Sequence, residues 1–301
     1  MTPPVSVADP STSSGTGFFS SVQDVHDRLA AQGYLADDTI ATTVYLADRL
    51  GKPLLVEGPA GVGKTELSKA VAGAVGAGFV RLQCYEGVDE ARALYEWNYR
   101  KQLLRIQASG EDAGWEQVHD DIFSEEFLLD RPLLTAIRRD EPTVLLVDES
   151  DKADLEFEAL LLEVLSEYQV TIPELGTVSA RRRPFVVVTS NATRDLSEAL
   201  KRRCLYLYID YPDPTRETEI VLTRVPGIGE DLAASLVRVV QAMRALDLRK
   251  HPSVAETIDW ARTLLALGRD SLDERAVTAT LGVVLKYASD QERARKELAL
   301  G

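Results

Sequence analysis

Short apolar runs alternate with longer amphipathic stretches over the first two thirds of the chain. The short runs match buried β-strands, whereas the longer stretches repeat apolar residues at helical spacing. Five strands are predicted, at residues 54–57, 79–83, 144–148, 185–190 and 205–209. Buried strands that alternate with helices are typical of a parallel sheet with helical crossovers. The pattern therefore predicts an α/β fold.

Both ends of the chain depart from this alternation. Residues 1–20 are rich in Ser, Thr, Pro and Gly and hold few apolar anchors, so a disordered tail is expected there. Two helices, broken at Gly33, are predicted before the first strand. The strand signal then ends, and residues 215–301 match helices rich in Ala, Leu, Arg and Glu. We therefore expect an α/β domain over residues 21–211 and a helical domain over 212–301.

Charge and composition narrow the possible partners. The 301-residue chain has a formal net charge of -14, which repels polyanions, so nucleic acid is not an expected partner. No apolar run long enough to span a bilayer and no signal-peptide pattern occurs, so the cytoplasm is the expected compartment. The two cysteines, Cys84 and Cys204, lack metal-ligand spacing and are expected to be reduced and buried.

A glycine-rich segment joins the first predicted strand to the helix expected from Glu66. Its residues are Gly58, Pro59, Ala60, Gly61, Val62, Gly63, Lys64 and Thr65. In this context the pattern is a P-loop, in which Gly61 and Gly63 let backbone N–H groups converge on phosphates at a helix N-terminus. Lys64 would reach the β and γ phosphates, and Thr65 would offer its hydroxyl to magnesium. The segment, with Glu66, predicts a site for ATP and Mg²⁺.

Two further predicted strands end in polar residues. Asp148 ends one of them and Glu149 follows it, at the sheet edge where ligands of such folds bind. Asp148 would hold magnesium, and Glu149 would orient and deprotonate the attacking water. The pair could instead cap the next helix. Asn191 follows another strand and could contact the γ-phosphate or the water, or simply form a turn.

Two arginines, Arg202 and Arg203, precede the last predicted strand. They could form a solvated helix end, or they could supply charge to the transition state in a neighbouring subunit. The three histidines, His26, His119 and His251, are scattered among ordinary helix-forming residues. No catalytic or metal-binding role is assigned to them.

With these motifs in this order, residues 22–301 resemble the AAA+ ATPases and, within them, the MoxR family. An apparent hairpin at residues 168–183 strengthens the resemblance, and the stretch at residues 83–99 is similar to the branch related to CoxD, an ATPase linked to maturation of carbon monoxide dehydrogenase. The resemblance implies a five-stranded parallel sheet of order 5-1-4-3-2 with a C-terminal helical lid. That order would place Cys84 and Cys204 at opposite edges of the sheet, too far apart for a disulfide.

The resemblance also implies a role for each matching position. Lys64 and Thr65 match Walker A, Asp148 and Glu149 match Walker B, Asn191 matches sensor 1, and Arg203 matches the trans-acting arginine, with Arg202 as the adjacent alternative. Adenine would lie near Tyr34 and Leu35, although Tyr34 could equally be a core residue. Where related proteins often carry a sensor 2 arginine, this chain has Ala255. Arg249 and Lys250 are close in sequence and are candidates to replace it.

Two segments are candidate contact surfaces. An aromatic and leucine stripe is expected to be core rather than a substrate-gripping surface. It comprises Leu94, Tyr95, Trp97, Tyr99, Leu103 and Leu104. In the hairpin, Pro173 and Gly176 mark an exposed turn, which is the better candidate for contacts that remodel another protein.

The function implied by the resemblance is that of an ATP-driven chaperone. Such proteins assemble as rings, with a hexamer expected, and mature a partner enzyme or insert its metal or cofactor. A von Willebrand factor A domain protein is the expected partner and a molybdenum hydroxylase a possible client. One alternative is a nucleic-acid motor of restriction type, which the net charge disfavours. Another is a nucleotide-gated module without hydrolysis, which the intact Glu149 and Asn191 disfavour.

Overall fold

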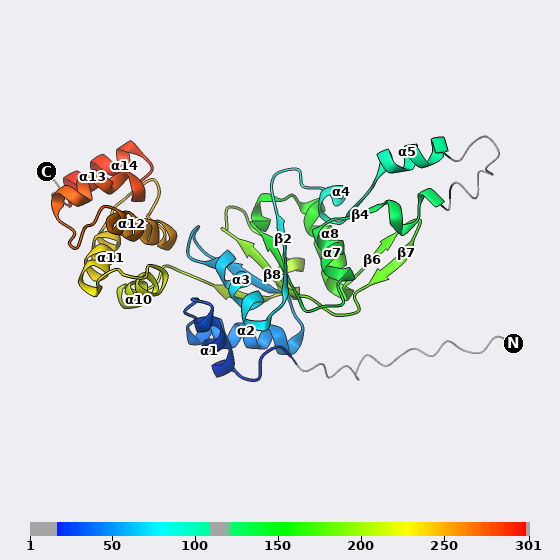
Figure 1. Ribbon diagram of the computed structural model, residues 1–301, viewed down its shortest axis with the longest axis horizontal. Coiled ribbons are helices and arrows are strands. Elements are labelled where there is room, and N and C mark those ends of the chain that lie inside the picture. The colour runs from blue at the N-terminus through cyan, green and yellow to red at the C-terminus, as the bar shows by residue number, and fades with distance from the viewer. Residues whose placement is uncertain (1–16, 109–118, 120, 299–301) are drawn as a thin grey trace.

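The computed structural model describes residues 17–108, 119 and 121–298, and its elements form an α/β part and a helical part (Figure 1). The main sheet contains β1 (Leu54–Glu57), β2 (Gly78–Gln83), β5 (Thr143–Asp148), β8 (Phe185–Ser190) and β9 (Leu205–Tyr208). The strands are parallel and their order is β2-β5-β8-β1-β9. When these five strands are numbered along the chain, this is the predicted order 5-1-4-3-2. The α/β fold class is confirmed.

Helices cover both faces of the main sheet. The helices of the α/β part are α1 (Val22–Ala31), α2 (Asp38–Leu50), α3 (Lys64–Val75), α4 (Glu90–Ala93), α5 (Tyr99–Ala108), α7 (Pro132–Arg138), α8 (Leu155–Glu167) and α9 (Glu198–Arg203), and all except α5 contribute residues to the two hydrophobic cores under the sheet. Successive residues of a strand point to opposite faces. Accordingly, Leu54 and Val56 belong to the core beneath α1, α2 and α3, whereas Leu55 belongs to the core beneath α7 and α8. No helix in the described part of the chain is both long and apolar enough to cross a membrane.

The N-terminal boundary differs from the expected disordered tail of residues 1–20. Residues 1–16 lie outside the described part, but residues 17–20 are placed. The Phe19 side chain is only 1% exposed, its backbone N–H donates to Asp48 Oδ2 at 3.0 Å, and the Arg28 guanidinium lies over its ring. One aromatic anchor is enough to hold this short segment against α1 and α2, and composition alone did not reveal it.

A second, smaller sheet between β2 and α7 was not predicted. It pairs β3 (Tyr95–Trp97) with β4 (Leu128–Asp130), which follows the short 3-10 helix η2 (Glu125–Phe127). Leu94 and Trp97 are buried there, as expected for core residues, and Tyr95 is partly buried against the same core. The strands are too short to show an alternating pattern, which explains why the sequence did not reveal them.

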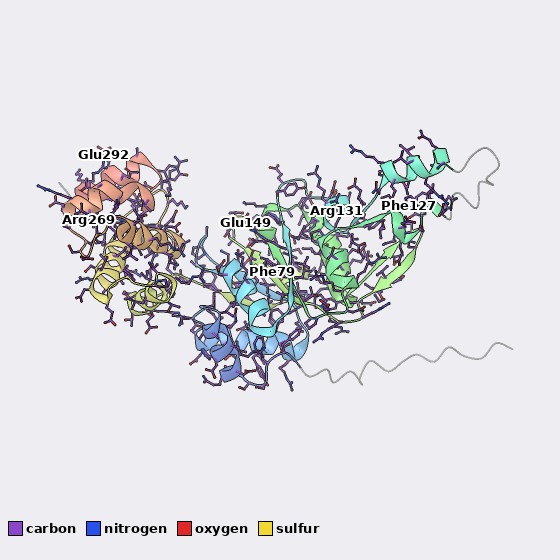
Figure 2. The ribbon with its side chains drawn as sticks, viewed as in Figure 1. Phe79, Phe127, Arg131, Glu149, Arg269 and Glu292 are labelled. Carbon is purple, nitrogen blue, oxygen red and sulfur yellow. The ribbon has the colours of Figure 1, made fainter. Side chains whose placement is uncertain are left out.

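Helix α5 contradicts the core assignment for the rest of the aromatic and leucine stripe. Tyr99, Leu103 and Leu104 are 61%, 59% and 67% exposed. The buried residue of this helix is instead Gln102, whose Nε2 donates to the Ile122 carbonyl at 2.8 Å. Figures 1 and 2 show why: α5 lies with Phe127 at one end of the molecule, away from the main sheet. Helical spacing reveals an apolar face, but it does not reveal what covers that face.

The predicted hairpin is confirmed. It consists of β6 (Gln169–Ile172) and β7 (Gly176–Ser179), which pair antiparallel. Val170 and Ile172 are buried against the core of the α/β part, whereas the turn at Pro173 is exposed. Gly176 has a φ of 83°, a conformation that favours glycine. The hairpin is thus anchored on one side and open to solvent at its turn.

The C-terminal helices form their own hydrophobic core. They are α10 (Pro214–Arg224), α11 (Glu230–Arg244), α12 (Val254–Ala266), α13 (Glu274–Val284) and α14 (Ala288–Glu297). This core contains the fully buried Trp260 and shares no residue with the two cores under the main sheet. On this ground we propose the division into domains at residues 21–211 and 212–301.

An ion pair is buried inside this helical unit. Glu217 of α10 is 0% exposed, and its carboxylate accepts two hydrogen bonds from Arg244 of α11, at 2.6 and 2.8 Å. It also accepts from Gln241 at 2.9 Å and from Thr257 of α12 at 2.8 Å. The Arg244 guanidinium lies over the Tyr211 ring at 4.4 Å. One buried carboxylate therefore joins three helices and the linker that precedes them.

Replacement of Arg244 by Ala is expected to lower the free energy of unfolding of the helical unit by about 3–5 kcal/mol, because Glu217 would be left buried without its cation. Urea unfolding followed by tryptophan fluorescence measures this, since Trp260 lies in the same core. Arg262→Ala is the matched control. Arg262 pairs with Asp259 on the surface, so a loss below about 0.5 kcal/mol is expected. Equal losses in the two variants would contradict the prediction.

Both cysteines are buried, and they lie beside opposite edge strands, as predicted. Burial raises the pKa of the Cys84 and Cys204 thiols to about 12. Neither thiol should therefore react with iodoacetamide at pH 8 until the chain is unfolded in urea.

The folded state keeps the thiol protons up to a higher pH than the unfolded state, so the free energy of unfolding should fall as the pH rises above about 9. Rapid alkylation of either thiol in the native protein would contradict the expected protection by burial.

Candidate nucleotide-binding site

The P-loop connects β1 to α3 through three glycines with positive φ. Gly58 has a φ of 149°, and a Cβ there would lie 1.9 Å from the Ile209 carbonyl oxygen, so only glycine fits. Gly63 precedes α3 and has no side chain to cap it. The helix begins at Lys64, two residues before the predicted start at Glu66. Its first N–H groups are therefore available to an anion, which is the arrangement that binds phosphate.

Lys64 is held by three hydrogen bonds inside the site. Its Nζ donates to the carbonyls of Gly58 and Pro59 at 2.6 and 2.7 Å and to Asn191 Oδ1 at 2.8 Å. Burial lowers the pKa of Lys64, and the carboxylates of Asp151, Asp148 and Glu149 oppose that effect. Phosphate oxygens can replace the two carbonyls as acceptors, so the lysine is placed to bind a phosphate that enters the loop.

Asp148 is buried at the end of β5 and accepts hydrogen bonds from side chains of three elements. Its Oδ1 accepts from Thr65 Oγ1 at 3.1 Å and from Thr189 Oγ1 at 2.6 Å. Its Oδ2 accepts from Arg81 Nε at 3.0 Å and Nη2 at 2.6 Å. Thr65 and Asp148 thus lie together, as predicted for magnesium. A hydroxyl and a carboxylate are oxygen ligands suited to Mg²⁺, which keeps several waters and binds phosphate oxygens as well.

Glu149 has a φ of 56°, which is unusual for a residue other than glycine. Its backbone N–H donates to Thr189 Oγ1 at 2.9 Å. Its carboxylate accepts from Gln83 Nε2 at 2.8 Å and from Asn191 Nδ2 at 3.4 Å. The side chain makes no cap hydrogen bond, and the cap of α8 is Asp154. The alternative of a helix cap at Glu149 is therefore not supported, and the carboxylate faces Asn191 instead.

Several residues that support this geometry were missed in the sequence. Arg81 and Gln83 of β2 hold Asp148 and Glu149. Asp151 accepts from the Asn191 N–H at 3.2 Å and from Thr193 Oγ1 at 2.6 Å, and so fixes the loop after β8. Burial raises the pKa of Asp151, but hydrogen bonds from Thr193 and Asn191 outweigh it and lower the pKa overall. The β2-β5 adjacency implied by the predicted strand order was the signal that could have found Arg81 and Gln83.

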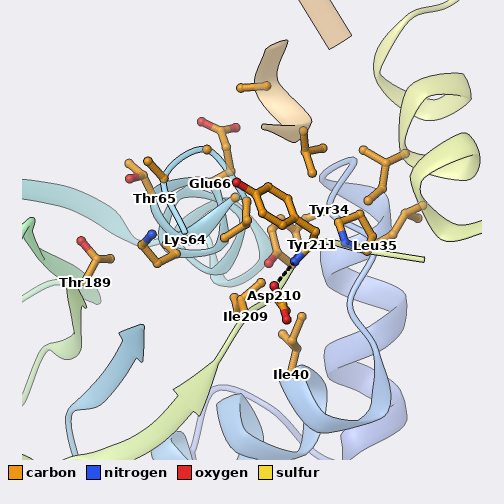
Figure 3. Close-up of a pocket in the computed structure, with 18 of the residues that line it drawn as sticks. Tyr34, Leu35, Ile40, Lys64, Thr65, Glu66, Thr189, Ile209, Asp210 and Tyr211 are labelled. Atoms are coloured by element: carbon orange, nitrogen blue, oxygen red, sulfur yellow. Dashed lines mark hydrogen bonds between the residues drawn. The ribbon is translucent and has the colours of Figure 1, made fainter. Parts of the chain in front are cut away.

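A cavity of about 630 Å³ lies beside the P-loop and extends toward the helical unit. Figure 3 shows Lys64 and Thr65 in one part of it and Tyr34, Leu35 and Tyr211 in another. The volume falls within the range of small-molecule sites. Tyr34 lines the cavity and also packs against the core, so both of its predicted roles are compatible with its position; burial raises its pKa. The apolar part of the cavity has room for a nucleobase.

Comparison with known proteins identifies the family. A family model described as "AAA domain (dynein-related subfamily)" matches residues 53–204, which extend from the start of the P-loop strand to the end of α9. The chain belongs to this AAA family. The MoxR-like type predicted from the motifs is confirmed, whereas the branch related to CoxD stays a prediction.

Curated relatives match most of this AAA protein. Protein NorQ of Paracoccus denitrificans is 24% identical over 257 residues, which cover 82% of this chain and 85% of NorQ. The denitrification regulatory protein NirQ of Pseudomonas aeruginosa is 25% identical over 231 residues, 74% of this chain and 79% of NirQ. Among solved structures, the RuvB Holliday junction branch migration motor of Thermotoga maritima is 16% identical with a TM-score of 0.46, covering 85% of this chain and 68% of that chain.

The helical lid of this AAA protein meets the P-loop through backbone. The Ala255 N–H donates to the Gly61 carbonyl at 3.3 Å, and a Cβ on Gly61 would lie 2.4 Å from Ser253 Oγ. Arg249 and Lys250, the candidates to replace a sensor 2 arginine, do not line the cavity. Arg249 stacks on Tyr287 at 4.2 Å, and Lys250 pairs with Glu256 at 3.0 Å. The lid cations that do line the cavity are Arg216 and Arg224, which the sequence reading missed.

The two arginines at the end of α9 are separate from the cavity of their own subunit. Arg202 and Arg203 are exposed, and neither lines the cavity. Arg202 lies 4.0 Å from Glu198, and Arg203 donates to Ser166. The geometry therefore brings Lys64, Thr65, Asp148, Glu149 and Asn191 together and leaves both arginines outside. Their action on a neighbouring subunit stays a prediction.

Proposed function

We propose that this AAA protein is a magnesium-dependent ATPase. The observation that carries the proposal is the convergence of Lys64, Thr65, Asp148, Glu149 and Asn191 at one edge of the sheet. Lys64 and the first N–H groups of α3 would neutralise phosphate charge, and Thr65 and Asp148 would hold Mg²⁺. When bound, the metal would stabilise negative charge on the phosphates. Glu149 would accept the proton of the attacking water, which Asn191 would help to orient.

Two variants separate binding from hydrolysis. Lys64→Ala is expected to weaken ATP binding at least tenfold, because it removes a charged hydrogen-bond donor from the phosphates. Glu149→Gln is expected to bind ATP with the parent affinity and to hydrolyse it at least a hundredfold more slowly, because the amide cannot accept the proton. Calorimetric titration measures binding, and phosphate release measures turnover. Hydrolysis at the parent rate by Glu149→Gln would overturn the assignment of the base.

The protein is further proposed to assemble as a ring, with a hexamer as the expected form. The position of Arg202 and Arg203 supports this, since both are exposed and lie outside the cavity of their own subunit. In a ring, Arg203 would complete the site of the neighbouring subunit and stabilise charge in the transition state. Arg202 is the adjacent alternative.

Subunit mixing tests this assignment. Arg203→Ala is expected to lower hydrolysis at least a hundredfold without weakening ATP binding, because the lost cation acts in the neighbouring site. Mixing Arg203→Ala with Lys64→Ala should restore part of the activity, since some interfaces in mixed rings then combine an intact P-loop with an intact arginine. Arg202→Ala is the matched control. Loss of activity in Arg202→Ala but not in Arg203→Ala would move the role to Arg202.

The proposal about partner and client proteins is made by analogy with the family. Of the two relatives, NirQ is named a denitrification regulatory protein. By analogy we propose a cytoplasmic chaperone that matures a partner enzyme, with a von Willebrand factor A domain protein as partner and a molybdenum hydroxylase as a candidate client. The exposed turn of the β6–β7 hairpin supports a surface for such contacts. The net charge of -14 disfavours a nucleic-acid motor.

A further inference from the structure

Helix α10 faces both the lid core and the nucleotide cavity. Arg216, Ile220 and Arg224 recur every four residues and line the cavity. Glu217 and Val221, each one position further along, are fully buried in the lid. Residues four apart lie on one side of a helix, so the same helix that anchors the lid core presents two arginines to the cavity.

Each of these arginines bridges the lid to the α/β domain at the cavity. Arg224 Nη2 lies 3.2 Å from Glu66 Oε2, and Glu66 directly follows the P-loop threonine. Arg216 Nη2 donates to the Leu35 carbonyl at 2.6 Å. Glu66 has a second cation, since Lys69 Nζ lies 2.7 Å from its other carboxylate oxygen. Arg224 can therefore leave Glu66 for another anion without leaving that carboxylate unpaired.

The carboxylates that line the cavity outnumber its cations, so cations from the lid would add to Lys64 and Mg²⁺ in offsetting the charge of a triphosphate. The described lining of the cavity contains six carboxylates, those of Asp37, Glu66, Asp148, Glu149, Asp210 and Asp213. Against them stand three cations, Lys64, Arg216 and Arg224. Two of the three thus come from α10, whereas the first turn of α12 contributes Ala255 and a backbone contact. A polyphosphate entering this cavity would be stabilised by a lid cation that can change partner.

We propose that Arg224 is the lid residue that binds the nucleotide, exchanging its bond to Glu66 for phosphate oxygens of ATP, while Arg216 keeps the lid fastened to the Leu35 carbonyl. This inference rests on the proposed ATPase function. It assigns the nucleotide contact of the lid to the first lid helix and not to the start of α12. Because Glu217 of α10 is bonded to Arg244 and Thr257, a movement of Arg224 would carry α11 and α12 with it.

Calorimetric titration of MgATP into the Glu149→Gln protein tests the inference, since this variant is expected to hold ATP without turnover. In that background Arg224→Gln should weaken ATP binding by roughly tenfold or more, as expected for the loss of a charged hydrogen bond. Arg224→Lys, which keeps the charge, should lose less. Arg249→Gln is the matched control, because Arg249 is a lid arginine outside the cavity, and it should change the affinity by less than about twofold.

A double-mutant comparison separates direct contact from an effect through Glu66. If Arg224 binds phosphate, Arg224→Gln should weaken ATP binding by a similar factor when Glu66 is already Gln. If the arginine acts only by holding Glu66, no further loss will occur in that background, and the inference is overturned. Equal affinities for Arg224→Gln and Arg249→Gln would overturn it too. Failure of Glu149→Gln alone to bind ATP would instead reject the proposed function.

Discussion

The buried carboxylate of Asp148 organises the site. A buried charge is costly unless it is paired and hydrogen-bonded, and here Thr65, Thr189 and Arg81 supply the partners. These three residues lie on α3, β8 and β2, so the pairing requires β5 to lie between β2 and β8 in the sheet. The strand order thereby brings the P-loop helix, the Asp148 carboxylate and the Asn191 loop to one edge.

The lid depends on a second buried carboxylate, that of Glu217. Its bonds to Arg244 and Thr257 join α10 to α11 and α12, and Arg244 also stacks on Tyr211 at the cavity. A polar link in the middle of an otherwise apolar core holds the helices in one arrangement, since sliding any of them would leave a buried charge unpaired. The lid is therefore built to move as one piece when a group on α10 moves.

The sheet, its order and the motifs of the candidate site were predictable because they depend on local patterns and on a family resemblance. Lys64, Asp148 and Asn191 converge as expected. What could not be predicted depends on which elements cover which. The leucines of α5 have the spacing of a core helix but lie exposed, and Arg216 and Arg224 line the cavity although α10 belongs to the helical unit. Such contacts depend on how the domains pack, and the spacing of apolar residues along the chain does not indicate that packing.

The hydrogen bonds of Lys64 have a consequence for exchange of nucleotide. In this structure the ammonium group is already satisfied by Gly58, Pro59 and Asn191, so an entering phosphate replaces existing bonds and does not fill a vacant donor. The net free energy gained from each new hydrogen bond to phosphate is correspondingly smaller. In the proposed ATPase cycle, the loop carbonyls and the asparagine would bond to the lysine again as product departs, which would favour release. An ammonium group with internal substitutes for its ligand would thus limit how tightly the spent nucleotide is retained between cycles.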